Sequence, residues 1–335
     1  MSLDHAAKPA APEKAKAPRF TFSQHMNEIS LFFAIVVLYV IFALTAPGFI
    51  SFNNQVNILR DAATIGIAAW AVTLIIIAGE IDVSVGPMVA FISVELAFLL
   101  QMGVPTPLAF VLAIAFGALL GAIPGILRAY FDVPSFVATL GMWSALRGTA
   151  LFVTDALPVS IGRNDMLDAL DRSLFGIPPA AIIMLILFGV FAFVSRKTAF
   201  GRSVFAVGGN AHAAFLSGIN VSRIRVALFA IGGAMAAISG ILLVSRLGSG
   251  NATAASGLEF DVIAAVVVGG TALSGGRGSM LGTLLGVLVI TLIGNGLVLL
   301  GINPFFQQVV RGLIIVIAVL ANIQAIKRSL SRNKG

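Results

Sequence analysis

Five carboxylate side chains stand within apolar stretches of the chain or at the edges of such stretches. They are Glu80, Asp82, Glu95, Glu259 and Asp261. A charge at the centre of a membrane-spanning helix costs roughly 2.5–3.5 kcal/mol on insertion scales, so such a group usually faces a cavity or a partner. Carboxylates accept hydrogen bonds from hydroxyl groups. These five side chains are therefore candidates for the lining of a pathway for a hydroxyl-rich solute.

Four of the five carboxylates form a repeated pair that also has a structural interpretation. Glu80-x-Asp82 and Glu259-x-Asp261 each stand just before an apolar run or at its start. An aspartate at a helix start accepts free backbone N–H groups and meets the positive end of the helix, which contributes about 0.5–2 kcal/mol. We favour helix capping for Asp82 and Asp261, with pathway lining as the competing interpretation.

Glu95 and Arg311 lie well inside apolar runs. For Glu95 we favour a place on a wet pathway. Arg311 fits such a pathway and a structural role equally well. In the structural role the two side chains would pair with each other, with Gln307 or Gln308, or with the backbone.

The longest polar interval in the second half of the chain covers residues 195–225, SRKTAFGRSVFAVGGNAHAAFLSGINVSRIR. It has five cations and no acidic residue, which is typical of a loop on the cytoplasmic side of a membrane. Asn210 suits a helix N-cap and Gly218 a C-cap, which predicts a helix over AHAAFLS. Two turns of helix are not stable alone in water. This helix either contacts a cytoplasmic motor protein or folds back on its own membrane domain.

The sequence contains no nucleotide-binding loop of the Walker A type, which requires Gly-x4-Gly-Lys-Ser/Thr. The nearest glycine cluster, residues 275–279, lacks that spacing, and we interpret it as a tight turn rather than a hinge. Cysteine is absent and the three histidines lie in tail or loop sequence. We therefore expect no metal, no cofactor and no catalytic set, and any ATP must be bound by another chain.

The elements that position these residues are predicted to be membrane-spanning helices. The chain is 59% hydrophobic and 10% charged, whereas soluble domains have about 25% charged residues. Apolar stretches near 20 residues can cross a bilayer as helices. Ten spans fit the pattern, at about 29–46, 61–78, 86–102, 107–127, 134–153, 177–195, 224–246, 260–274, 280–300 and 305–322.

The distribution of positive charge predicts the orientation of these spans. With the N-terminus inside, 15 of the 21 lysines and arginines fall in inner segments and four in outer segments. This asymmetry favours cytoplasmic termini. Residues 1–28 are predicted to be a disordered cytoplasmic tail, residues 29–322 a transmembrane domain, and residues 323–335 a basic cytoplasmic tail.

An internal repeat divides the predicted domain into halves at about 29–153 and 177–322. The Glu-x-Asp-Val motif occurs in both halves, at Glu80 and at Glu259. Ile-Pro-Gly-Ile-Leu at residues 123–127 has a counterpart in Ile-Gly-Asn-Gly-Leu at residues 293–297. Five spans per half would place the two halves in opposite orientations, as in transporters that work by alternating access. The sequence thus predicts an all-α polytopic membrane protein with two inverted five-helix repeats.

Four stretches of this sequence resemble a known family. They are GEIDVSVG, TAFGRSVFAVGGNAHAAFLSGINVSRIRV, GLEFDVIAAVVVGGTALSGGRGSMLGTLLG and GINPFFQQVVRGLIIVIAVLAN. In this order, over about residues 30–322, they are similar to the permease subunits of ribose-type bacterial ABC sugar importers. Glu80 departs from the pattern, because the family usually has a small or apolar residue before Ile-Asp. Sugar specificity is therefore not carried over.

The resemblance implies a multi-pass protein of the bacterial inner membrane that forms a homodimer, or a heterodimer with a close paralogue, around one pathway. It also implies a cytoplasmic ATPase with two nucleotide-binding modules, a periplasmic binding protein that delivers the sugar, and no nucleic-acid partner. The GGNAHAAFLSGI stretch corresponds to the family's coupling region. The matching residues are Gly209, Asn210, Ala213, Ala214, Ser217, Gly218 and Ile219.

Two functional classes compete at this point. The first is the membrane subunit of an ATP-driven importer for a small sugar or polyol. The second is a self-sufficient, ion-coupled secondary transporter, which also uses inverted repeats and intramembrane carboxylates. The capped helix in the basic loop favours the importer, because a secondary transporter does not require it.

Overall fold

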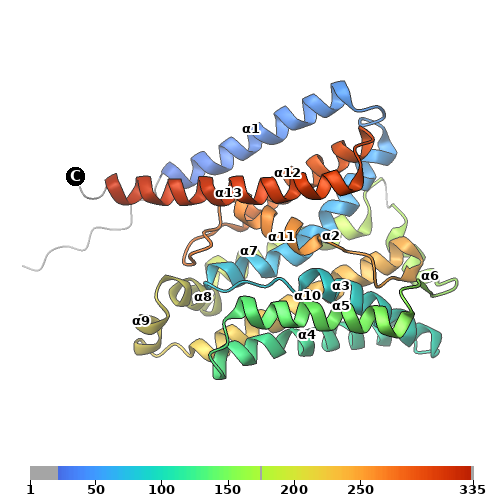
Figure 1. Ribbon diagram of the computed structural model, residues 1–335, viewed down its shortest axis with the longest axis horizontal. Helices are drawn as coiled ribbons and strands as arrows, with labels where there is room; N and C mark the ends of the chain where they lie inside the picture. The colour runs from blue at the N-terminus through green and yellow to red at the C-terminus, as the bar shows by residue number, and fades with distance from the viewer. Residues whose placement is uncertain (1–21, 174–175, 333–335) are drawn as a thin grey trace, which may run out of the picture.

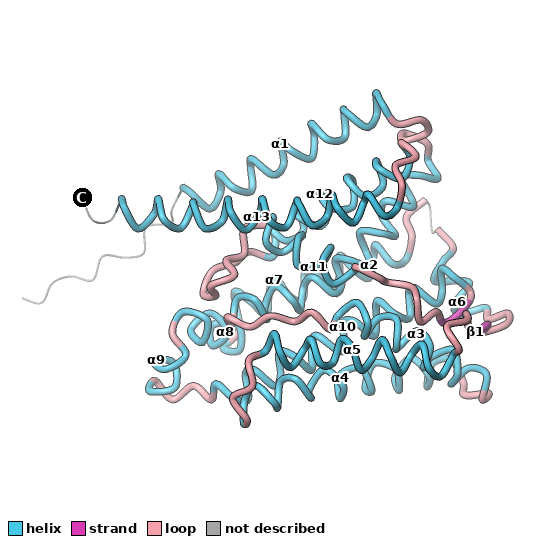
Figure 2. Tube along the Cα trace, in the orientation of Figure 1, coloured by secondary structure: helices cyan, strands magenta, loops and turns pink. Residues whose placement is uncertain are grey.

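The computed structural model describes residues 22–173 and 176–332 of the 335-residue chain. Within those ranges the chain forms thirteen α-helices and one short pair of antiparallel strands. Most helices run along the long direction of the molecule (Figure 1). Figure 2 shows that the connections between the helices gather mainly at the two ends of the molecule, with two longer loop segments lying between helices in the interior. The chain is therefore a helical, multi-pass membrane protein.

In the described part of the chain, seven helices are long and apolar enough to cross a membrane. They are α1 (Phe22–Thr45), α2 (Phe52–Ile77), α4 (Thr106–Tyr130), α5 (Ser135–Thr154), α7 (Pro179–Lys197), α10 (Val221–Leu247) and α12 (Met280–Leu299). Bare backbone cannot face lipid, so helices that satisfy their own N–H and C=O groups are the expected solution.

The other three predicted spans differ in length or composition from full crossings. They correspond to α3 (Val85–Gln101), α11 (Leu258–Val268) and α13 (Pro304–Arg332). At 1.5 Å per residue, the eleven residues of α11 extend about 16 Å, roughly half of a 30 Å hydrocarbon layer. The helix stops because Gly269 and Gly270 follow it, and Gly270 has a φ of +88°. The predicted span at 260–274 is therefore a half-length helix followed by a turn.

Helix α2 forms the centre of the molecule. Its residues Ile67, Trp70 and Leu74 are at most 1% exposed, and α7, α10, α11 and α12 pack around it. Helix α10 in turn packs against α3 and α4, and α1 lies against α12. The core therefore lies along α2 and α10, whereas α1, α4, α5 and α13 present many large apolar side chains outward, as lipid-facing helices do.

Helices α4 and α10 approach each other unusually closely. A Cβ added at Gly117 would lie 2.7 Å from the Gly233 carbonyl oxygen, and one at Gly125 would lie 2.9 Å from the Val226 Cα. At Gly121 an added Cβ would collide with the Phe229 carbonyl oxygen. Small residues four apart thus allow backbone-to-backbone packing, as the sequence indicated.

The two ends of the molecule carry different elements. The α9 end, at the left of Figure 1, contains α8 (Ala199–Gly209) and α9 (Ala211–Leu216). The α6 end, at the right, contains α6 (Asp165–Asp171) and the strand pair β1 (Val159–Ser160) and β2 (Ser249–Gly250). The start of α1 and the end of α13 both lie at the α9 end.

The boundaries of the predicted tails need correction. Helix α1 begins at Phe22, so residues 22–28 are helical and are not part of a disordered tail. The rest of that predicted tail, residues 1–21, lies outside the described residues. Helix α13 continues to Arg332, through most of the predicted basic tail.

The α4–α10 contact yields a test of the packing. Gly121→Val should lower the melting temperature of the detergent-solubilised protein, because the valine side chain with its two methyl groups would have to displace the backbone of α10. Gly189→Val, on the exposed face of α7 with no atom within 4 Å of an added Cβ, is the matched control. Equal melting temperatures for both variants would contradict the close approach.

Candidate functional site

The predicted coupling segment forms helix α9, with a cap at each end. The Asn210 side chain accepts a hydrogen bond from the Ala213 backbone N–H at 3.0 Å. Gly218 has a φ of +83°, and the N–H groups of Gly218 and Ile219 bond the carbonyls of Phe215 and Ala214. This is a Schellman ending, which favours glycine at the left-handed position. Both caps were predicted from the sequence.

One face of α9 is turned to solvent and the other to the protein. Phe215 and Leu216 are 65% and 72% exposed, whereas Ala214 is 4% exposed. Most predicted coupling residues are exposed too, while Ile219 is partly buried and Ala214 packs inward. Ala214 therefore anchors the segment to its own chain, and the apolar pair Phe215–Leu216 is the part available to another protein.

The glycine cluster at residues 275–279 forms a tight turn beneath this segment. The Gly276 N–H donates to the Ile77 carbonyl at 2.8 Å, at the end of α2. Gly275, with a φ of +82°, approaches Gly208 and Gly79 so closely that an added Cβ would lie 2.8 Å from the Gly208 carbonyl oxygen. The turn therefore joins the end of α8 to the connection between α2 and α3.

Glu80 lies in that connection and is held by two arginines. The Arg128 Nε donates to both carboxylate oxygens at 3.0 Å, from the end of α4. The Arg225 Nε lies 2.7 Å from Oε1, at the start of α10. The Glu80 side chain is only 4% exposed. This arrangement, the Glu80 clamp, ties three helix ends together at the α9 end and favours a structural role for Glu80.

Asp82 is buried two residues further on. Its Oδ1 accepts the Ser84 backbone N–H at 2.8 Å and the Ser84 hydroxyl at 2.6 Å. The carboxylate thus orders the turn that enters α3, just ahead of the helix rather than within its first turn. The N-cap position of α3 is Ser84, and no side chain caps that helix, so the prediction that Asp82 caps it is wrong.

Glu259 meets the start of α3 from the second half of the chain. Its Oε1 accepts the Trp143 indole N–H at 2.9 Å. Its Oε2 lies so close to Gly86 that a Cβ there would collide with it, and among the described residues this oxygen has no hydrogen-bond partner. A carboxylate beside the first turn of a helix is stabilised by the positive helix end. Glu259 and the first turn of α3 thus join the two halves.

Asp261 does not cap α11, so that part of the capping prediction is wrong. The N-cap position is Gly257, with a φ of +83°, and Asp261 lies one turn inside the helix. Its Oδ1 instead pairs with the Arg311 Nε at 3.2 Å, from α13. Arg311 therefore pairs with Asp261 rather than with Glu95. Glu95 is partly buried in α3, and one of its oxygens has no partner among the described residues.

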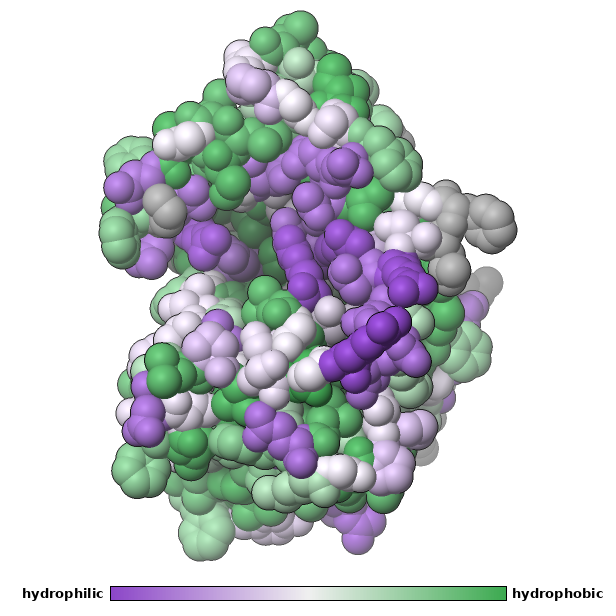
Figure 3. All heavy atoms as spheres, turned by 90° about the vertical axis from the view of Figure 1, so that its right-hand side faces the viewer, coloured by the Kyte–Doolittle hydropathy of each residue, from purple (hydrophilic) through white to green (hydrophobic). Residues whose placement is uncertain are grey.

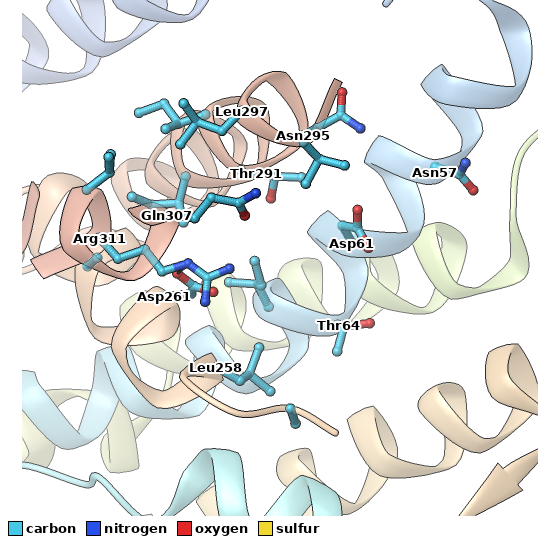
Figure 4. A pocket seen from close by; sticks show the side chains of 18 of the residues that line it. Asn57, Asp61, Thr64, Leu258, Asp261, Thr291, Asn295, Leu297, Gln307 and Arg311 are labelled. Atoms are coloured by element: carbon cyan, nitrogen blue, oxygen red, sulfur yellow. Dashed lines mark ion pairs between the residues drawn. The ribbon is translucent and has the colours of Figure 1, made fainter. Parts of the chain in front are cut away.

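A cavity of about 560 Å³, lined by both polar and apolar side chains, opens beside the Asp261–Arg311 pair, between α2, α10, α11, α12 and α13. Seen from the α6 end, the molecule is hollowed between two lobes, and hydrophilic residues gather along the hollow (Figure 3). Figure 4 shows the Asp261–Arg311 pair, Thr291 and Gln307 on one side, with Asp61 and Thr64 of α2 across from them.

The amides and the second ion pair of this cavity bridge different helices. Asn54 and Asn295 exchange side-chain hydrogen bonds of 3.0 and 2.8 Å between α2 and α12. Asp61 pairs with Arg246 between α2 and α10. Of the five predicted pathway residues, only Asp261 lines this cavity. The structure places Glu80, Asp82, Glu95 and Glu259 elsewhere.

The arginine partners and the cavity amides were not predicted. Arg128 and Arg225 lie 48 and 145 positions from Glu80 in the sequence, so no local spacing connects them. A usable signal did exist, because a buried carboxylate requires a cation, and each of these arginines stands at the inner end of a predicted span.

Together, the lipid-facing helices, the cavity with its ion pairs and the capped helix at one end are features expected of a multi-pass helical transport protein. The family model described as "Branched-chain amino acid transport system / permease component" matches residues 54–319. The chain belongs to this family.

Curated relatives narrow the class. The chain is 70% identical over 307 residues to the probable ABC transporter permease protein YphD of Escherichia coli (strain K12), which covers 92% of each chain. It is 41% identical to the ribose import permease protein RbsC of Bacillus subtilis (strain 168), over 90% of this chain and 94% of that protein. It is 34% identical to the xylose transport system permease protein XylH of Escherichia coli (strain K12), over 88% and 91%. No solved structure matches the chain.

These relatives decide between the two competing classes. The chain is the permease subunit of an ABC importer, as predicted, and the secondary-transporter alternative is wrong. The relatives are transport permeases and not enzymes, which agrees with a non-catalytic subunit.

The Glu80 clamp yields a second test. Glu80→Gln should destabilise the protein by on the order of 2 kcal/mol, because two partly buried guanidinium groups lose their counter-charge. Thermal unfolding in detergent measures this. Asp132→Asn is the matched control, because Asp132 also pairs with Arg128 but its side chain is 94% exposed. If the control loses as much stability as Glu80→Gln, the clamp is not a structural tie.

Proposed function

We propose that this permease imports a small sugar or a related polyol, delivered by a periplasmic binding protein and driven by ATP that a separate cytoplasmic subunit hydrolyses. The observation that carries the coupling to ATP is helix α9, a short helix capped at both ends that presents Phe215 and Leu216 to solvent. Two turns of helix with exposed apolar residues need a protein partner.

The substrate class rests on the relatives and on the cavity chemistry. Permeases named for ribose and for xylose import share 41% and 34% of their aligned residues with this chain. The lining of the cavity is rich in amide, hydroxyl and paired charged groups, which donate to and accept from sugar hydroxyls. The family description names branched-chain amino acids, and the paired charges of the cavity argue against that substrate.

The orientation follows from charge. The α9 end carries Arg196, Lys197, Arg202, Arg223 and Arg225, and an excess of positive charge marks the cytoplasmic side. Both ends of the described chain lie at the same end as α9 (Figure 1). We therefore place the α9 end in the cytoplasm and the α6 end in the periplasm, with the protein in the inner membrane.

An inverted repeat is supported by helix pairing. Helix α10 packs against α3 and α4, and α2 packs against α11 and α12. If α2–α5 correspond to α10–α13, these contacts are equivalent. The first members, α1 and α7, do not follow the rule, because α1 lies on α12 and α7 on α2. We propose ten membrane segments, of which α3 and α11 are the short ones.

The pathway is proposed to form between two copies of the chain or between this chain and a close paralogue. Helix α5 supports this, because its outward face combines large apolar residues at both ends with a small-residue centre at Gly141, Ala145 and Gly148. Such a face allows close helix approach in a membrane. Glu95 and the Glu259 region, which contacts α5 through Trp143, remain pathway predictions.

Energy should come from ATP in trans. In proteoliposomes, the permease with its ATPase and binding protein should accumulate radiolabelled sugar only when ATP is inside. The permease alone should move no sugar in response to an imposed proton or sodium gradient. Gradient-driven accumulation without the ATPase would contradict the proposal.

The exposed pair on α9 should be needed for coupling but not for folding. Leu216→Asp should leave the amount in the membrane unchanged while reducing co-purification of the ATPase about tenfold or more, because a charge would be buried at the contact. Leu157→Asp, 66% exposed at the α6 end, is the control. Ala214 is unsuitable as a probe, because its burial means that a substitution there would disturb the segment itself. Normal ATPase association in Leu216→Asp would remove the coupling assignment.

A further inference from the structure

We propose that the cavity between α2, α10, α11, α12 and α13 is a binding subsite for one neutral polyhydroxylated sugar, entered from the α6 end. This inference rests on the proposed function and goes beyond it, because it places a sugar site within a single permease chain. Its volume of about 560 Å³ lies within the range of about 300–1,000 Å³ that is usual for small-molecule sites.

An unsatisfied hydroxyl points to a missing ligand. Thr291 of α12 is 3% exposed and lines the cavity. Its Oγ1 is buried and has no hydrogen-bond partner among the described residues. A buried hydroxyl without a partner costs about 1–3 kcal/mol. A sugar hydroxyl in the cavity would supply the missing hydrogen bond.

The charges in the cavity favour a neutral ligand. Among the described residues, four charged side chains line it, and each is already paired: Asp61 with Arg246, and Asp261 with Arg311 at 3.2 Å. Neither sign of charge is in excess, so an anion or a cation gains no counter-charge. An amino acid would find its two ionic groups facing pairs that are already closed. Neutral hydroxyls can still bond the remaining oxygens and N–H groups of these pairs.

The cavity wall contains irregular backbone between two helices of the membrane domain. Residues 248–257 link α10 to α11 without a continuous helix, and Ala255 and Ser256 of this segment line the cavity. Ala255 has a φ of +54°, in the left-handed region that alanine rarely adopts. Non-helical backbone inside a membrane protein is tolerated where it is buried in protein or lines a wet cavity. A ligand site explains why the chain is unwound here.

The test uses the absence of cysteine from the chain. Thr291→Cys introduces a single thiol, whose labelling by a membrane-impermeant reagent is measured on the full chain in lipid nanodiscs. With D-ribose or D-xylose at about ten times its Kd, labelling should slow roughly tenfold. Leucine should not protect. Asn57→Cys, at a partly exposed position in the same cavity, should show the same protection and covers the case in which Thr291→Cys does not fold.

Thr45→Cys is the matched control, because Thr45 is exposed at the end of α1, outside the cavity. Its labelling should not respond to sugar. The subsite would be overturned if both cavity positions label but sugar protects neither, or if neither position labels at all. It would also be overturned if sugar protects the control equally, or if only leucine protects. ATP-driven sugar import that persists without protection would reject the subsite alone. Protection with import that needs no ATP would reject the proposed function alone.

A direct binding measurement tests the same subsite. Thr291→Val keeps the shape of the side chain and removes the hydroxyl, so radiolabelled D-ribose or D-xylose should bind about threefold to tenfold more weakly. Thr45→Val should bind as the wild type does. Unchanged affinity in Thr291→Val would show that this hydroxyl does not contact the sugar.

Discussion

The bilayer offers no water to a buried polar group, and this constraint organises the chain. Every carboxylate that the sequence places inside the membrane domain must find a cation, a hydrogen-bond donor, a helix end or a wet cavity. Glu80 finds two arginines, Asp82 finds its own following residue, Glu259 finds Trp143 and the start of α3, and Asp261 finds Arg311. The contacts of Glu80, Glu259 and Asp261 also join different helices, so satisfying these charges and fixing the helix arrangement are one event.

Local features could be predicted from the sequence because their causes are local. The caps of α9 depend on Asn210 and Gly218, which lie within ten residues of each other, and both were predicted. The small residues of α4 recur at fixed spacing, and they pack as expected. Helix ends were less certain, as the start of α1 at Phe22 shows, because a polar segment such as residues 22–28 can continue a helix whose stability comes from its apolar part.

The predictions that failed concern contacts between residues that lie far apart in the sequence. The sequence placed Asp261 at the cap of a helix, but the helix begins at Leu258, directly after Gly257, and Asp261 is its fourth residue. Glu95 was one of several partners considered for Arg311, because both lie in apolar runs, but α13 packs against α11, where Arg311 meets Asp261. Apart from Asp261 and Arg311, the lining of the cavity was not predicted, since it comes mainly from five helices whose packing no spacing reveals.

The contacts at the α9 end connect the coupling helix to the rest of the protein. Helix α9 follows α8, whose Gly208 contacts the glycine turn at Gly275 and Gly276, and that turn bonds the end of α2. Helix α10 begins five residues after the end of α9, and its Arg225 pairs with Glu80. Two sets of contacts therefore link α9 to the connection between α2 and α3, one through the backbone and one through an ion pair. The same connection leads through Asp82 into α3, and α3 contacts Glu259 of the opposite half. Both halves of the permease are therefore physically joined to the helix on which the ATPase is proposed to act.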